Sequence, residues 1–142
     1  MRKIACVAIA ILTSLWVLPC FAQSTDNEPR DPNAPENTIK IPGRDIYVNG
    51  MDEPKRMSWD VAKSVCECKG KGWRLPTIGE LQTIYQYKDM FANFDREYYW
   101  AKEQNPRSGR YYNVKFKNGK VADEEVDERN KVRCVWSPVK VD

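Results

Sequence analysis

The chain has 142 residues, of which 23 are Lys or Arg and 20 are Asp or Glu, so its formal net charge is +3. So small a net charge does not predict nucleic acid or another polyanion as a partner; only local clustering of basic residues could do so. Histidine is absent, which excludes Ser/His/Asp and Cys/His nucleophile arrangements and the ordinary zinc sites that contain histidine.

Residues 1–22 have the pattern of a secretory signal peptide. A basic head, Arg2-Lys3, precedes an almost unbroken apolar run at residues 4–18, which is too short and wrongly flanked for a membrane anchor. Cleavage after Ala22 predicts an exported protein, either periplasmic, secreted or at the cell surface, with no later transmembrane segment. Lipidation at Cys20 is the alternative, disfavoured because proline stands directly before that cysteine.

Residues 23–43 are rich in Asp, Asn, Glu, Pro and Thr. Such a composition buries too little apolar surface to offset the entropy of ordering, so we expect a flexible polar leader. Residues 44–138 are then expected to form one small folded domain, and residues 139–142 a tail.

The first elements of this domain are a short strand at residues 45–49, a turn at Asn49-Gly50, and a helix capped by Ser58. Gly70 or Gly72 is expected to end the helix. Cys68 lies about 200° round the helix from Cys66, at the edge of the apolar arc. The apolar positions of the helix recur at helical spacing and are Trp59, Ala62, Val65 and Cys66.

A second helix is predicted from a capping box. Thr77 and Glu80 have the required spacing, so each side chain can bond the backbone amide of the other, and Pro76 fixes the entry to the turn. One apolar face follows, made of Ile78, Leu81, Ile84 and Tyr85.

The remainder of the chain has the pattern of strands. We expect strands at residues 98–100, 112–117 and 131–136, with a type I′ hairpin at Asn118-Gly119. Two early helices followed by antiparallel strands predict an α+β domain, with the helices packed on small antiparallel sheets.

Several of these residues together resemble the DUF1566 family, also called the Lcl C-terminal domain after a collagen-like adhesin of Legionella. The resemblance covers residues 57–136 and implies a C-type-lectin-like domain related to the fold of the formylglycine-generating enzyme. The motif residues, in chain order, are Trp59, Ala62, Cys66, Gly72, Trp73, Arg74, Leu75, Pro76, Thr77, Glu80, Leu81, Tyr99, Trp100, Phe116, Gly119, Val132, Arg133, Cys134 and Val135.

The resemblance also implies a disulfide between Cys66 and Cys134. Cys66 is the cysteine on the apolar side of its helix, and so long a loop would remove about 4 kcal/mol of unfolded-chain entropy. A bridge between Cys66 and Cys68 would close a small, strained ring. Cys68 is then left over, either as an incidental thiol or as an intermolecular or redox site.

A basic segment gives the first functional hypothesis. No acidic residue stands between Glu103 and Asp123, and in a strand Lys115 and Lys117 would project from the same face. The adhesin domain of the family binds sulfated glycosaminoglycans, so the resemblance implies acidic glycans as ligands. Acidic residues from Asp123 to Glu128 could instead neutralise the stripe. The candidate binding residues are Arg107, Arg110, Tyr111, Tyr112, Lys115, Lys117 and Lys120.

The alternative is an envelope module that binds another protein or serves a structural role in an envelope assembly. No pattern in the sequence separates a glycan from a protein partner. We expect no enzymatic activity, because the related oxidases hold copper with a cysteine pair, whereas Cys66 is assigned to the disulfide. No calcium site is expected either, since residues 103–106, Glu-Gln-Asn-Pro, lack the order of the lectin calcium tripeptides. We therefore predict neither metal nor cofactor.

Overall fold

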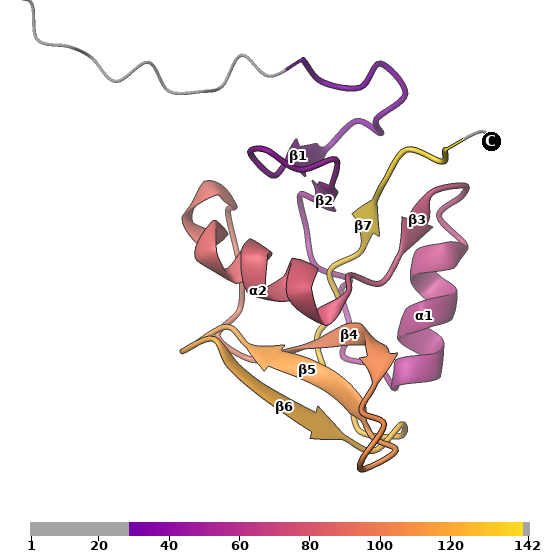
Figure 1. Cartoon of the computed structure of the whole chain (residues 1–142), viewed down its shortest axis with the longest axis vertical. Coiled ribbons are helices and arrows are strands. Elements are labelled where there is room, and N and C mark those ends of the chain that lie inside the picture. Colours follow the sequence, from indigo (N-terminus) through magenta and orange to yellow (C-terminus); the bar gives the residue numbers. More distant parts are fainter. Residues whose placement is uncertain (1–28, 141–142) are drawn as a thin grey trace, which may run out of the picture.

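The computed structural model describes residues 29–140, so the predicted signal peptide and the alternative lipidation site lie outside the described residues. Two helices and two antiparallel sheets make up this part of the chain (Figure 1), which confirms the predicted α+β class. In chain order the elements are β1 (Thr38–Lys40), β2 (Tyr47–Asn49), α1 (Trp59–Glu67), β3 (Trp73–Arg74), α2 (Ile78–Gln86), the 3-10 turn η1 (Lys88–Met90), β4 (Tyr98–Gln104), β5 (Tyr111–Lys115), β6 (Lys120–Glu124) and β7 (Val135–Trp136).

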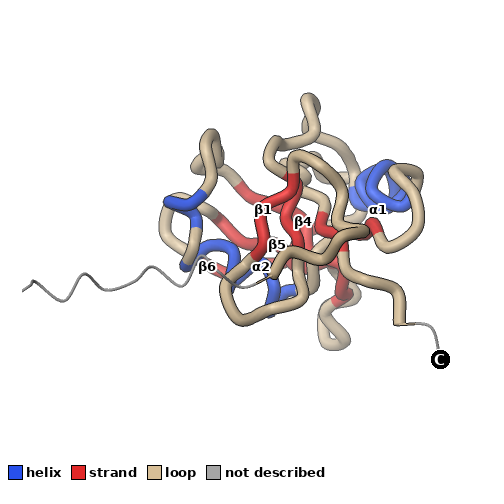
Figure 2. The backbone as a smooth tube through the Cα atoms, turned by 90° about the horizontal axis from the view of Figure 1, so that it is seen from above, coloured by secondary structure: helices blue, strands red, loops and turns tan. Residues whose placement is uncertain are grey.

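The two sheets divide the domain into two parts. Strands β1, β2, β7 and β3 form a four-stranded sheet in that order, and β4, β5 and β6 form a three-stranded meander. Helix α2 lies across β4 and β5, whereas α1 lies beside β3, with strands between the two helices when the molecule is seen from above (Figures 1 and 2). No helix within residues 29–140 is long and apolar enough to cross a membrane.

The larger core lies between the two sheets. Helix α2 contributes Leu81 and Ile84, which are buried on the face predicted from its periodicity. The capping box is confirmed, because Thr77 Oγ1 accepts a hydrogen bond from the amide of Glu80 and the Glu80 carboxylate accepts one from the amide of Thr77. The buried members of this core are Ile41, Val48, Leu81, Ile84, Phe91, Tyr99, Ala101, Val114, Phe116 and Val135.

The smaller core joins α1 to the middle and the end of the chain. Ala62 and Cys66 of α1 are fully buried, and Cys66 is bonded to Cys134 with an S–S distance of 2.01 Å. These two cysteines pack with Leu75, Trp100 and Val132. The disulfide therefore ties the first helix to the segment that leads into the last strand.

The expected leader differs from the structure in its second half. Residues 38–40 are strand β1, which pairs antiparallel with β2, and Ile41 is fully buried. The composition of residues 23–43 is polar on average, but Ile39 and Ile41 supply enough apolar surface to seal one edge of the larger core. An average over twenty residues conceals so short an apolar segment.

Other predicted bounds differ too: the closing strand, expected at residues 131–136, is only Val135–Trp136. Helix α1 ends at Glu67, before both glycines, with Cys68 as its C-cap. The type I′ turn at Asn118-Gly119 is wrong, because that turn needs positive φ at both residues and only Gly119 has it, at 73°. The strands are instead joined by residues 116–119, between the paired Lys115 and Lys120. Gly119 is required there because a Cβ atom would lie 2.6 Å from the Tyr85 ring.

Candidate ligand-binding surface

The five predicted basic side chains do not form one stripe. Arg107 and Arg110 lie in the connection from β4 to β5, whereas Lys117 and Lys120 lie at the turn between β5 and β6. These places are at opposite ends of β5 (Tyr111–Lys115), which are about 13 Å apart at the usual rise of a strand. Each end therefore has to be considered by itself.

The arginine end carries its own counter-charges. Arg110 Nε donates to Glu125 Oε1 at 2.8 Å, and this hydrogen bond raises the pKa of Arg110 above its ordinary value. Asp123 Oδ2 accepts hydrogen bonds from Asn105 at 2.5 Å and from Ser108 at 2.7 Å. Asp123 and Glu125, two residues of the acidic run from Asp123 to Glu128, therefore act on this end of the hairpin.

The lysine end is different. Lys115 and Lys120 are directly opposed across β5 and β6, and the Lys115 Nζ lies 4.9 Å from the centroid of the Tyr98 ring. Lys117 projects from the turn and is exposed. Within residues 29–140 no carboxylate lies within ion-pair distance of these three side chains. We call Lys115, Lys117 and Lys120 the lysine cluster.

Two acidic side chains of the segment that leads into β4 are bound elsewhere. Glu97 pairs with Arg56 at 3.5 Å, and Asp95 pairs with Lys131 at 3.2 Å. Desolvation acts to raise the pKa of Asp95, but the hydrogen bonds and charge that it receives, chiefly from Lys131, hold that pKa below its ordinary value. Both carboxylates are therefore paired with other cations and not with the lysine cluster.

Two further basic residues, which the sequence does not predict, lie near the lysine cluster. The amide of Lys117 donates to the carbonyl of Arg96 at 3.1 Å, which places the two residues side by side. The Nζ atom of Lys88 lies 4.6 Å from the centroid of the Tyr85 ring, and this ring packs against Gly119. Neither residue adjoins the cluster in sequence, so only the packing of η1 and of the segment before β4 could reveal them.

A pocket of about 350 Å³ adjoins this region. Its aromatic floor includes Phe116, the residue before Lys117, and Phe94, whose rings are stacked with centroids 4.5 Å apart. Its rim carries one cation and two carboxylates, so it is not basic like the cluster beside it. The lining residues are Lys88, Asp89, Phe91, Asn93, Phe94, Asp95 and Phe116.

The two predicted tyrosines do not join the lysine cluster. The ring of Tyr111 stacks on Trp59 with the centroids 3.8 Å apart, and Tyr112 packs against the larger core. Both rings are only half-buried, yet their contacts are with the domain itself. The structure thus gives these tyrosines a place in the framework.

Most of the motif residues are framework residues as well. Trp59 Nε1 donates to the carbonyl of Ala101 at 2.9 Å, and Trp100 Nε1 donates to that of Met57 at 2.8 Å. Arg74 binds both carboxylate oxygens of Glu80, at 2.7 and 2.8 Å. These contacts fix the turn between β3 and α2 and the positions of the two helices on the sheets. The same region is completed by Trp73, Leu75, Pro76 and Thr77.

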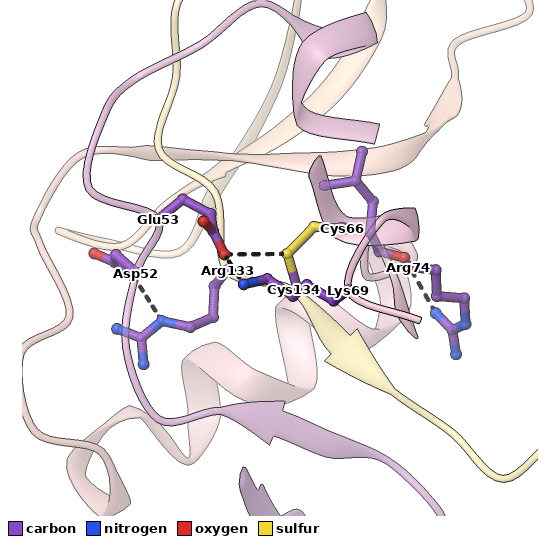
Figure 3. The surroundings of a disulfide bond; sticks show 8 residues. Asp52, Glu53, Cys66, Lys69, Arg74, Arg133 and Cys134 are labelled. Atoms are coloured by element: carbon purple, nitrogen blue, oxygen red, sulfur yellow. Dashed lines mark hydrogen bonds and ion pairs between the residues drawn. A yellow bond between two sulfur atoms is a disulfide. The ribbon is translucent and has the colours of Figure 1, made fainter. Parts of the chain in front are cut away.

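The surroundings of the disulfide are polar on one side (Figure 3). Glu53 Oε1 lies 2.7 Å from Lys69 Nζ and 3.6 Å from the sulfur of Cys134. Cys68 is exposed and unbonded. No group of three His, Cys, Asp or Glu side chains among residues 29–140 is placed to hold a metal ion.

Comparison with known proteins identifies a family and a fold. The family model of the Lcl C-terminal domain matches residues 29–136, so it also includes β1. A search of curated proteins gave no match.

Solved structures of similar fold include botrocetin, with a TM-score of 0.55 and 14% identity over 75% of this chain and 100% of that one. EMS16, an antagonist of the collagen receptor integrin alpha2beta1, has a TM-score of 0.56 and 11% identity over the same shares. Ovocleidin-17, from the calcified layer of the Gallus gallus eggshell, has a TM-score of 0.55 and 14% identity over 74% of this chain and 99% of that one.

At such identities the likeness concerns the fold, which is C-type-lectin-like in these structures. With the family match over most of the chain, the expected resemblance is confirmed. The chain belongs to the Lcl C-terminal domain family.

Proposed function

We propose that this domain is a non-catalytic binding module of an exported protein, and that its lysine cluster binds acidic glycans, sulfated ones above all. The family and the fold support a binding role. The disulfide supports export, because thiols pair durably in oxidising compartments.

One observation carries the glycan proposal. Lys115 and Lys120 stand directly opposite one another on the sheet, and like charges in that position repel. No described carboxylate relieves the repulsion. An external sulfate or carboxylate group placed between the two ammonium groups would do so, with Lys117 as a third contact.

The face of the sheet favours a broad ligand over a small one. Lys115 and Lys120 project opposite to Val114, which is buried beneath α2. Their heads therefore meet solvent beside the half-buried ring of Tyr98. An extended polyanion that gains most of its affinity from such exposed charges should be released by salt.

The test measures binding of the intact exported chain to heparin, to its unsulfated precursor polysaccharide and to neutral dextran, over a salt series. A variant with Lys115, Lys117 and Lys120 changed to alanine is compared with a matched control in which exposed Lys55, Lys102 and Lys140 are changed. We expect heparin binding that falls with salt, a loss of at least about tenfold in the first variant, and little change in the control.

Equal losses in both variants would show that net charge, and not the cluster, governs binding. Absence of heparin binding at physiological salt would exclude the glycan proposal. The second candidate function, recognition of an envelope protein, would then be favoured. It is supported by EMS16, a protein of similar fold that is an antagonist of a receptor protein. Cross-linking from the exposed Cys68 in envelope preparations would test it, with a single stoichiometric adduct as the expected result.

A further inference from the structure

Strand β6 leaves one edge of the three-stranded sheet open. It is the outermost strand in Figure 1 and pairs only with β5. Among the described residues no backbone hydrogen bond from outside the sheet reaches Lys120–Glu124. Open edges recruit other strands unless something covers or distorts them.

The opposite edge of the same sheet is covered. The amide of Trp100 donates to the carbonyl of Lys131 at 3.1 Å, and the amide of Lys131 donates to the carbonyl of Tyr98 at 2.9 Å. Further along β4, the amide of Lys102 donates to the carbonyl of Pro76 at 2.8 Å. Of the two edges of this sheet, only the β6 edge is left open by residues 29–140, so addition of one strand there would not propagate into a fibre.

The sequence of β6, Lys-Val-Ala-Asp-Glu, is self-complementary. If two copies pair antiparallel about a two-fold axis at Ala122, Lys120 of each copy stands opposite Glu124 of the other. Directly opposed residues of an antiparallel pair lie on one face, so the two ammonium groups meet the two carboxylates. A shift of the axis to Val121 or to Asp123 loses both of these pairs.

The side chains of Lys120 and Glu124 are placed to make this pairing. Lys120 is exposed and has no carboxylate near it in its own copy. Glu124 accepts a hydrogen bond from Asn130 through Oε2 at 2.5 Å, which orients the carboxylate and engages one of its oxygens. The exposed Val121 would also lose water contact at the junction.

We propose that the β6 edge is a docking surface for a second copy of this chain. The two copies together form a symmetric dimer with one continuous six-stranded sheet. The shared edge is only five residues long, so the buried area lies below that of a standard interface and the dimer is a weak one. The inference does not depend on glycan binding, since it requires only the edge and its two charges.

The test uses the intact exported chain with Cys68→Ser, which prevents an intermolecular disulfide. Sedimentation equilibrium from about 5 μM to about 1 mM should show a reversible monomer–dimer equilibrium, as expected for a small interface. Lys120→Glu and Glu124→Lys should each weaken association at least about tenfold, and the double exchange should restore it. Lys102→Glu is the matched control, because it makes the same charge change at an exposed position on β4, at the other edge of the sheet.

A mass that stays monomeric up to the highest concentration would overturn the proposal, as would a double exchange that fails to restore association while the variant remains folded by circular dichroism. A second measurement needs no variant: amide hydrogen exchange within residues 120–124 should slow as concentration rises, whereas unchanged exchange would contradict pairing. Heparin binding is measured at dilution, where the chain is monomeric, so failure of one proposal is distinguishable from failure of the other.

Discussion

The Nε atom of Arg133 donates a 2.6 Å hydrogen bond to Oδ1 of Asp52, although the two residues are far apart in the chain. The Arg133 side chain is fully buried, and its guanidinium also lies 3.9 Å from the centroid of the Phe94 ring. The other oxygen of Asp52 accepts a hydrogen bond from the Tyr99 hydroxyl at 2.7 Å. Figure 3 shows the ion pair beside the disulfide. A single carboxylate therefore satisfies two buried groups.

Replacement of Asp52 by alanine should lower the free energy of unfolding by about 3–5 kcal/mol, because it leaves a buried guanidinium without its counter-charge. Desolvation and the hydrogen bond to Asp52 also raise the pKa of Tyr99, so that hydroxyl stays a donor. Chemical denaturation measures the change. Asp127→Ala, at an exposed position, is the control, and equal effects of the two substitutions would contradict the role of the buried pair.

The Arg74–Glu80 pair predicts a dependence of stability on pH. Burial acts to raise the pKa of Glu80, but hydrogen bonds from Arg74 and from the Thr77 amide, with the charge of Arg74, leave that pKa below its ordinary value. The stabilisation is therefore complete above the unfolded-state pKa, about 4.3, and is lost as pH falls through the lower folded-state pKa.

Glu80→Gln should cost about 1–2 kcal/mol at neutral pH, through the cap and the ion pair, and should flatten the acid limb of the stability curve. Urea titrations between pH 7 and pH 3 measure both effects. Glu67→Gln provides a control on the exposed side of α1. A wild-type stability that does not change below pH 5 would contradict the assignment.

The disulfide between Cys66 and Cys134 spans 68 residues. Its removal by the double change to alanine should lower the free energy of unfolding by about 4 kcal/mol, chiefly through greater entropy of the unfolded chain. Thermal and urea unfolding of the wild type and the variant test this. Cys68→Ser should change stability by less than about 0.5 kcal/mol, since that side chain is exposed and unbonded.

Asn113 has a fully buried side chain whose two polar atoms have no hydrogen-bond partner. Replacement by leucine, which has a similar size, should raise the free energy of unfolding by about 1–2 kcal/mol, because it removes an unsatisfied amide. Asn130→Leu is the contrasting variant: its amide donates to Glu124, so its loss should destabilise the domain. If both variants were destabilised equally, the unsatisfied state of Asn113 would be refuted.

The parts of the fold that local chemistry determines were predictable from the sequence. The capping box of Thr77 and Glu80 needs only residues three apart, and the buried positions of α2 follow from helical spacing. The pairing of Cys66 with Cys134, by contrast, came from the family resemblance, since no local rule joins a helix to a distant strand.

The parts that depend on distant contacts could not be predicted from the sequence. Strand β1 is three residues long and is held by β2, so residues 38–40 show no recognisable periodicity. The turn at Gly119 is shaped by the ring of Tyr85, which arrives from another element. For the same reason the basic residues from Arg107 to Lys120 are close in sequence but divided in space, whereas Lys88 and Arg96, which are distant in sequence, lie near the lysine cluster.

Strands β1 and β7 belong to one sheet, joined through β2. The described chain therefore enters and leaves the domain on the same side, and the three-stranded sheet lies on the other (Figure 1). An anchor attached at either end would hold the domain by its four-stranded sheet and point the β4–β5–β6 hairpins outward. Which terminus carries the anchor would then matter little, because the orientation of the domain relative to a supporting surface is built into the order of its strands.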